Sequence, residues 1–251
     1  MIMINDIIKT YGRITALKIH LLMIEQNEIC GIIGNNGAGK TTMLKAIIDL
    51  IKLDKGCIKI NGVDVSKSEN WKIYTSAFID TTFLIDYLTP IEYFQLIGYY
   101  YMIDQGVLYE NIEKYKQFLG LDIFNNKKMI REHSSGEQNK IGIIGAMIVN
   151  PALLLLDEPN SFLDPNSQIL LKKHLSSYQQ AGGTILLSSH NINLITEICT
   201  KILLLEKGNV IEVFNVDELT ISKINKYFQK SCGLPAQPDP IDGLDKIITS
   251  V

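Results

Sequence analysis

The sequence predicts an α/β fold, in which a core of parallel strands and helices carries a small antiparallel β subdomain and an inserted α-helical subdomain. Three observations predict this fold. Short, wholly apolar runs at 153–156 and 184–188 are typical of parallel strands that are buried on both faces. Two strand-like runs near the N-terminus, 2–9 and 17–24, favour a separate small sheet. The stretch 83–146 then changes to a helical pattern that is rich in tyrosine.

The elements between these landmarks follow in chain order. The run 28–33 is apolar and ends in glycines, as a strand does before a turn, and residues 41–50 have helical spacing. Asn61-Gly62 stands between the runs 57–60 and 63–65, and this dipeptide is a strong signal for a hairpin. We therefore expect a strand, a helix and a hairpin in the first quarter of the chain.

A second hairpin at 202–205 and 210–213 is expected to close the main domain. We expect that domain to span residues 1–225, with the helical subdomain at about 83–146. Residues 226–251 are expected to form a C-terminal extension, because the tail from Ser231 holds Gly233, Pro235, Pro238, Pro240 and Gly243.

The composition excludes several classes of protein. Lys and Arg total 24 and Asp and Glu total 27, so that the formal net charge is −3. With 46% hydrophobic and 20% charged residues, the chain does not have the composition of a disordered protein. The lack of a net basic charge argues against nucleic acid as a partner.

The cysteines and the apolar stretches bear on where the chain works. None of the four cysteines forms a C-x-x-C pair, so the sequence indicates neither a zinc site nor a redox dithiol, and reduced cytoplasmic thiols are expected. No secretory signal is evident at the N-terminus. The charge-free stretch 141–156 contains Pro151 and is too short to cross a bilayer. If the protein works on a membrane, another chain must supply the spanning segments.

The most specific motif is a glycine-rich loop that matches G-x-x-x-x-G-K-[ST] at every position, between a predicted strand and a predicted helix. Backbone N–H groups and a helix N-terminus would surround the phosphates of a nucleotide. Lys40 would reach the β- and γ-phosphates, and Thr41 would ligate Mg²⁺. The alternative is a glycine turn that precedes a helix by chance. The predicted nucleotide-binding residues are Gly34, Asn35, Asn36, Gly37, Ala38, Gly39, Lys40, Thr41 and Thr42.

Two acids follow the predicted strand 153–156, at the strand end where such sheets bind ligands. Asp157 would hold Mg²⁺ directly or through water. Glu158 would orient the water that attacks the γ-phosphate or accept its proton. The alternative is a pair of surface acids that only solubilise the strand end.

With these motifs the chain resembles the ATP-binding subunits of ABC transporters over roughly residues 1–225. The resemblance implies a P-loop NTPase core of the ABC type. It rests on five further elements that occur in the family's order: an aromatic residue, the signature motif, the extended Walker B motif, the D-loop and the switch histidine. Their positions here are Tyr11, 134–138, 157–159, 161–164 and His190.

The resemblance also implies residue roles. Tyr11 would stack on adenine, and His190 would contact the γ-phosphate and join Lys40 and Glu158 as a catalytic residue. Ser134 and Gly136 would meet the γ-phosphate of the nucleotide bound by the opposite subunit. Ser134-x-x-Glu137 is also a capping box, which would stabilise its helix whatever the function.

The largest departure from the family is at the Q-loop. The family has a Gln after the strand that leads into the helical subdomain, and the aligned residue here is Asp80. An Asp offers an oxygen to Mg²⁺, but an ionised carboxylate cannot donate a hydrogen bond. Asp80 is therefore expected to be a metal ligand. It is not expected to donate a hydrogen bond to the attacking water, which is the second role of the family's Gln.

The resemblance implies an ATP-hydrolysing subunit that uses ATP and Mg²⁺ and pairs with a second copy or another ATPase subunit. It implies a membrane-spanning permease docked near Asp80 and the aromatic subdomain, on the inner face of the cell membrane. The Ser-x-Gly signature followed by Lys140-Ile141-Gly142-Ile143 is similar to that of bacterial drug, bacteriocin and bacitracin-type exporters. No regulatory domain is expected after residue 225, unlike in the long sugar-importer subunits, so export is the expected direction. The alternatives are a soluble ABC ATPase of the iron–sulfur-assembly type and a phosphate-loop kinase outside the family.

Overall fold

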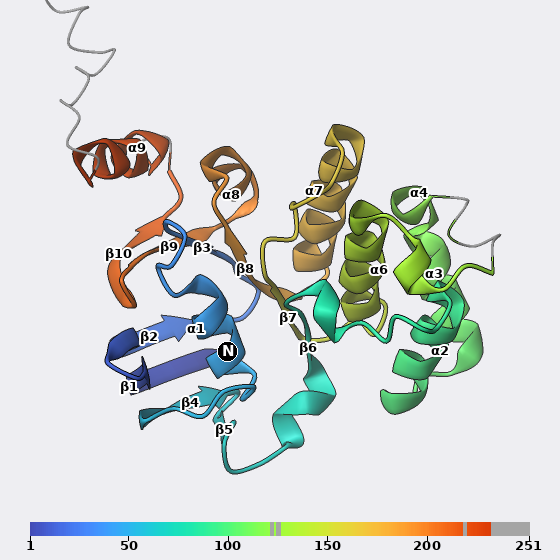
Figure 1. Ribbon diagram of the computed structural model, residues 1–251, viewed down its shortest axis with the longest axis horizontal. Coiled ribbons are helices and arrows are strands. Elements are labelled where there is room, and N and C mark those ends of the chain that lie inside the picture. The colour runs from blue at the N-terminus through green and yellow to red at the C-terminus, as the bar shows by residue number, and fades with distance from the viewer. Residues whose placement is uncertain (121–122, 124–126, 218–219, 232–251) are drawn as a thin grey trace, which may run out of the picture.

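The computed structural model describes residues 1–120, 123, 127–217 and 220–231, and it contains two β-sheets with helices around them (Figure 1). The smaller sheet is antiparallel, with the strand order β2-β1-β4-β5. Its strands are β1 (Ile2–Tyr11), β2 (Ile14–Ile24), β4 (Lys55–Ile60) and β5 (Val63–Asp64). This sheet confirms the predicted β subdomain, which lies at the lower left of Figure 1.

The larger sheet has the strand order β10-β9-β3-β8-β7-β6. Its strands are β3 (Ile29–Ile33), β6 (Thr75–Phe78), β7 (Leu153–Leu156), β8 (Thr184–Ser189), β9 (Lys201–Glu206) and β10 (Asn209–Asn215). All neighbours pair in parallel except β9 and β10, which form the predicted closing hairpin. Every residue of β3, β7 and β8 is buried, as expected for parallel strands that are covered on both faces.

Helices cover the larger sheet and form a separate group at its β6–β7 side (Figure 1). The α-helices are α1 (Lys40–Ile47), α2 (Pro90–Tyr100), α3 (Gln105–Lys114), α4 (Lys116–Leu119), α6 (Ser135–Met147), α7 (Pro165–Gln180), α8 (Ile192–Ile198) and α9 (Thr220–Ser231). Short 3₁₀ turns are η1 (Asn70–Tyr74), η2 (Thr81–Phe83) and η3 (Ile130–Glu132). The helices α2, α3, α4 and α6 confirm the predicted helical insertion between β6 and β7.

The hairpin β1–β2 is longer than the sequence predicts. Tyr11 pairs with Ile14, which leaves only Gly12 and Arg13 for the turn. Gly12 has φ +60°, a backbone conformation that glycine adopts without steric cost. The predicted strands 2–9 and 17–24 omit the paired residues next to the turn.

The end that the sequence predicts for the main domain, residue 225, falls inside α9. Ile224 is fully buried, and Tyr227 and Phe228 pack against the main hydrophobic cluster. The Tyr227 hydroxyl also donates a hydrogen bond of 2.5 Å to Glu206 on β9. These three residues lie on one helical face, so the first turns of the predicted extension are attached to the core. The glycine- and proline-rich remainder lies outside the described residues.

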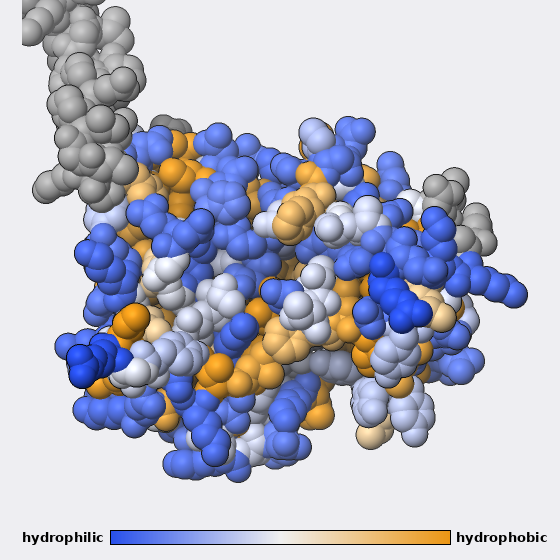
Figure 2. Space-filling model, viewed as in Figure 1, coloured by the Kyte–Doolittle hydropathy of each residue, from blue (hydrophilic) through white to orange (hydrophobic). Residues whose placement is uncertain are grey.

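None of the helices in the described residues is long and apolar enough to cross a membrane. The stretch 141–156 instead forms most of α6, a short connection and β7, as the sequence predicts. Figure 2 shows hydrophilic residues over most of one face, with apolar side chains reaching the surface at several places across its middle.

Candidate nucleotide-binding site

The glycine-rich loop connects β3 to α1, which begins at Lys40. Gly39 has φ +106°, and a Cβ there would lie 2.8 Å from the carbonyl oxygen of Ala16. At Gly34 a Cβ would lie 2.3 Å from the carbonyl oxygen of Leu205. Both positions therefore need glycine, one for its backbone angle and both for space. Residues of this loop and the first residues of α1 line one cavity, which is the arrangement that a phosphate group requires.

Lys40 is buried, and its Nζ donates a hydrogen bond of 2.8 Å to the carbonyl oxygen of Gly34. The same Nζ lies 3.6 Å from a carboxylate oxygen of Glu158. The ammonium group is thus held over the loop by a backbone acceptor and a nearby negative charge. That is the position from which it would contact phosphate oxygens.

Thr41, Asp157 and Ser188 form a hydrogen-bonded chain across the ends of α1, β7 and β8. The Thr41 hydroxyl donates to one oxygen of Asp157 over 2.5 Å, and the Ser188 hydroxyl donates to the other. The Ser188 oxygen also accepts a 2.9 Å hydrogen bond from the backbone N–H of Glu158. Ser188 therefore fixes both acids relative to β8, a contact that no motif in the sequence indicated.

The surroundings of Asp157 suit a cation. Burial raises the pKa of its carboxyl group and the negative charge of Glu158 raises it further, while the hydrogen bonds from Ser188 and Thr41 and the charge of Lys40 lower it. A buried carboxylate beside a hydroxyl is the kind of oxygen donor set that Mg²⁺ accepts. Mg²⁺ is usually held by one or two protein side chains together with phosphate oxygens.

Glu158 lies between Lys40 and His190. Its second carboxylate oxygen is 2.8 Å from Nδ1 of His190 and accepts a 3.3 Å hydrogen bond from the His190 backbone N–H. The side chain of His190 is 69% exposed, whereas that of Glu158 is 25% exposed. The structure thus brings together the three residues that the sequence predicts to be catalytic, with His190 on the open side.

A cavity of about 410 Å³ lies in front of the loop. It is lined by Ile14, Thr15, Ala16, Asn36, Gly37, Ala38, Gly39, Lys40, Thr41, Thr42, Glu158 and Lys207. The sequence missed Ile14 to Ala16 and Lys207, which come from the ends of the hairpins β1–β2 and β9–β10. The backbone bonds Lys18 N–H to Gly208 oxygen, 2.7 Å, and Gly208 N–H to Ala38 oxygen, 2.8 Å, bring these hairpins to the loop.

Tyr11 lies beside this cavity but is not among its lining residues. Its side chain is 50% exposed, and the Nζ of Lys9 lies 5.1 Å from the ring centroid. Tyr11 pairs with Ile14, which lines the cavity, and an exposed aromatic ring there is compatible with stacking on a base. Its role as the adenine contact stays a prediction.

Asp80 faces the two acids from the end of β6. It shares a cavity of about 240 Å³ with Asp157, Glu158, Asn139 and Phe162, among other residues. Its carboxylate also accepts a 2.8 Å hydrogen bond from the Thr82 backbone N–H and so caps η2. The Asp80 side chain therefore lines the same cavity as the two acids and also caps η2.

The signature segment starts α6 and lies apart from the loop of its own chain. Ser134 is the N-cap: its oxygen accepts from the Glu137 backbone N–H at 3.3 Å, and Glu137 accepts from the Ser134 N–H at 2.8 Å. The capping-box alternative is thus confirmed as a structural fact. Ser134 is exposed and is not among the residues that line the phosphate-loop cavity.

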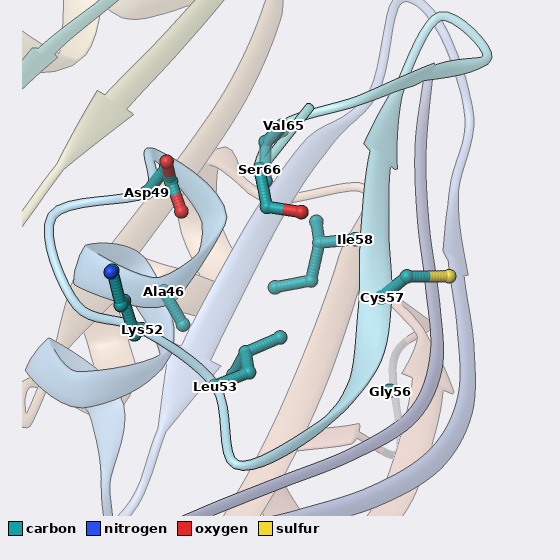
Figure 3. A pocket seen from close by; sticks show the side chains of 9 residues that line it. All are labelled: Ala46, Asp49, Lys52, Leu53, Gly56, Cys57, Ile58, Val65 and Ser66. Atoms are coloured by element: carbon teal, nitrogen blue, oxygen red, sulfur yellow. The ribbon is translucent and has the colours of Figure 1, made fainter. Parts of the chain in front are cut away.

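A further cavity of about 230 Å³ lies at the opposite end of α1 from the glycine-rich loop (Figure 3). Its walls come from the C-terminal end of α1 and from the segment around β4 and β5, including Asp49, Cys57 and Ser66. Residues of the glycine-rich loop do not line it, so it is separate from the nucleotide-binding candidate.

Known proteins are similar to this chain in sequence and in fold. The model of the family described as "ABC transporter" matches residues 17–161. The bacitracin transport ATP-binding protein BcrA of Enterococcus faecalis is 29% identical, over 86% of this chain and 69% of its own. The methionine import ATP-binding protein MetN of Clostridioides difficile (strain 630) is 30% identical, over 87% of this chain and 70% of its own. A solved structure of an ATP-binding subunit of an ABC transporter aligns over 100% of both chains, with a TM-score of 0.80 and 24% identity, and confirms the predicted fold class.

Proposed function

The chain belongs to the ABC transporter family of ATP-binding proteins, and from that premise we propose that it hydrolyses ATP to drive a membrane-spanning permease. The observation that carries the proposal is the position of Glu158, whose carboxylate lies 3.6 Å from Nζ of Lys40 and 2.8 Å from Nδ1 of His190. An acid that only solubilised the strand end would not need contacts with both the phosphate-loop lysine and an exposed histidine. The arrangement fits a carboxylate that positions a water in front of a bound γ-phosphate.

ATP is the proposed substrate, with Mg²⁺ as its partner ion. Thr41 and Asp157 would hold the ion, with Asp80 as a third oxygen donor from the facing loop. When bound, Mg²⁺ neutralises charge on the β- and γ-phosphate oxygens. Lys40 and the N–H groups of the loop bind and orient the same phosphates. Tyr11 is the proposed adenine contact.

Glu158, His190 and Lys40 have different proposed roles in the hydrolysis step. Glu158 would accept a hydrogen bond from the attacking water and receive its proton. His190 orients Glu158 through the Nδ1 contact, and its exposed position would let the other side of the ring reach the γ-phosphate. Lys40 would stabilise charge on the phosphate oxygens as the bond to the leaving group breaks.

We propose that two copies, or this chain and another ATPase subunit, enclose two ATP molecules around a two-fold axis. Ser134, which is exposed, and Gly136, which is half-buried, lie at the start of α6 and would then contact the γ-phosphate held by the opposite copy, through a helix N-terminus. The separation of Ser134 from the loop cavity of its own chain supports this arrangement. No nucleic acid is expected among the partners.

The permease would dock beside the helical insertion and place the subunit at the inner face of the cell membrane. Phe83 and Tyr87, just after Asp80, are exposed. A separate groove of about 630 Å³ lies between η1 and the C-terminal end of α2, and it is lined by Glu69, Lys72, Ile73, Tyr100, Tyr101 and Met102. Met102 is 93% exposed, and a surface of this kind favours a protein partner. Buried Phe94 in the same helical group shows that the aromatic residues form both core and surface.

Export is the proposed direction of transport. It is supported by the resemblance of the signature segment to bacitracin-type exporters. Membrane vesicles that contain this subunit and its permease test the proposal. ATP supplied on the cytoplasmic side should drive substrate out of that side; uptake into it would overturn export. If no permease co-purifies, the soluble iron–sulfur-assembly type becomes the better description.

Asp80 gives the first prediction. Asp80→Gln keeps an oxygen for the metal, adds an amide donor for the water and removes a negative charge near the triphosphate. We expect its steady-state ATPase rate to equal or exceed that of the wild type. Asp80→Ala has no side-chain oxygen, so its rate should fall clearly. The measurement is the ATPase rate of the full chain at saturating Mg-ATP.

A control for Asp80 is Asp86→Ala, which removes an exposed carboxylate a few residues further along the same segment. Its ATPase rate should stay at the wild-type value. Wild-type rates in both Asp80 variants would show that Asp80 is no metal ligand and only caps η2.

A further inference from the structure

Asn139 joins the signature helix to the loop that follows the catalytic carboxylate. It lies on α6, one helical turn beyond the cap at Ser134, and is 5% exposed. Its amide nitrogen donates to two backbone carbonyl oxygens, those of Pro159 at 3.0 Å and Ser161 at 2.7 Å. One side chain on α6 thus donates hydrogen bonds to two carbonyl oxygens of the loop between β7 and α7.

The loop from Glu158 to Phe162 is held in an unfavourable conformation. Glu158 has φ +45° and Phe162 has φ +65°, in the left-handed region that residues with a side chain rarely adopt. Between them, both amide atoms of Asn160 are buried without a hydrogen-bond partner among the described residues. Such features persist only where the surroundings over-determine the backbone.

Backbone hydrogen bonds within this loop, such as that from the Ser161 N–H to the Glu158 carbonyl oxygen at 3.0 Å, are joined by contacts to other elements. At its start, the Glu158 backbone N–H donates to Ser188. At its end, the carbonyl oxygen of Phe162 lies so close to Gly136 that a Cβ there would be 2.6 Å away. Asn139 supplies the two side-chain hydrogen bonds to the middle of the loop. Without them the strained segment would relax, and the backbone that carries Glu158 would move with it.

We propose that Asn139 is a positioning residue for the catalytic site. It holds the loop 158–162 so that the Glu158 carboxylate faces Lys40 and His190, and it makes the start of α6 and this loop move as one unit. The inference rests on the proposed hydrolytic role of Glu158. It adds that contact of the signature end of α6 with a nucleotide would be transmitted to Glu158 of the same chain.

The test compares Asn139→Ala with Asn111→Ala in the full chain. Asn111 is a matched control: it is 4% exposed, and its amide donates a 2.8 Å hydrogen bond to the carbonyl oxygen of Ile148 at the far end of α6. Asn139→Ala removes two amide–carbonyl hydrogen bonds and Asn111→Ala removes one, so both changes should lower the melting temperature. Asn139→Ser, which keeps one short donor, is the milder variant if the alanine protein does not fold.

Two readouts are measured. Backbone amide hydrogen exchange of a peptide that covers residues 158–163 should be at least tenfold faster in Asn139→Ala and unchanged in Asn111→Ala, with no nucleotide present. The kcat for ATP should fall at least tenfold in Asn139→Ala, while the Kd for a fluorescent ATP analogue stays within twofold, because the phosphate loop keeps its own hydrogen bonds.

Unchanged exchange in the loop overturns the proposal whatever the ATPase result. Faster exchange with unchanged kcat, or an equal fall of kcat in Asn111→Ala, also overturns it. The exchange result could be as expected while the wild-type protein shows no ATPase activity. That outcome would contradict the hydrolytic function and the catalytic part of this inference, but it would still show that Asn139 holds the loop 158–162.

Discussion

Glu158→Gln is expected to bind Mg-ATP normally and to hydrolyse it about 10²–10⁴-fold more slowly than the wild type, the range usual for loss of a general base. Gln has the shape of Glu and can still contact His190, but it cannot accept the proton of the attacking water. The measurement is single-turnover hydrolysis by the full chain, together with a binding titration. Glu113→Gln, which changes an exposed carboxylate paired with Lys116, should hydrolyse at the wild-type rate.

The same variant should accumulate as a dimer when ATP is present, because hydrolysis is the step that reopens the pair. Size-exclusion chromatography with Mg-ATP would show this as a species of twice the mass. If the variant and the wild type both stay monomeric, a different ATPase subunit is the partner.

Lys40→Ala is expected to abolish detectable ATPase activity and to weaken ATP binding. The change removes a buried positive charge that lies over the phosphate loop, within 2.8 Å of the Gly34 oxygen, and a charge-assisted contact to phosphate is among the stronger polar contacts. Steady-state ATPase and a fluorescence titration are the measurements. Lys67→Ala removes a lysine whose side chain is 79% exposed and should leave both values unchanged; near-normal turnover in a folded Lys40→Ala protein would contradict the phosphate-loop assignment.

The parts of the fold that the sequence predicted are those that local patterns determine. The strands β7 and β8 are short apolar runs between turn signals, and burial on both faces requires that composition. The phosphate loop was predictable because its glycines are needed for space, as the contacts at Gly34 and Gly39 show. The cap at Ser134 was predictable because it involves residues only three positions apart.

The parts that could not be predicted depend on contacts between distant segments. Lys207 reaches the site only because the β9–β10 turn bonds to the backbone of β2 and of the phosphate loop. Ser188 contacts both acids only because β8 pairs with β7. The attachment of α9 through Tyr227 and Glu206 likewise joins a helix to a strand, and no pattern within either segment indicates it.

Asn139 and the loop 158–162 illustrate the same limit at the catalytic site. The D-loop motif was visible in the sequence, but a strained backbone at Glu158 and Phe162 was not, since neither is a residue that favours positive φ. An asparagine inside an apolar helical segment has many structural explanations. Only the two hydrogen bonds to Pro159 and Ser161 identify its partner.

The proposal that two chains share each nucleotide is tested most directly by mixing two inactive variants, Lys40→Ala and Ser134→Asp. Asp keeps the N-cap of α6 but places a negative charge where a phosphate of the opposite chain would lie. Each variant alone should be inactive. A mixed dimer has one site with Lys40 from one chain and Ser134 from the other, so random pairing should restore about a quarter of wild-type ATPase activity. A mixture no more active than its components would contradict the shared site.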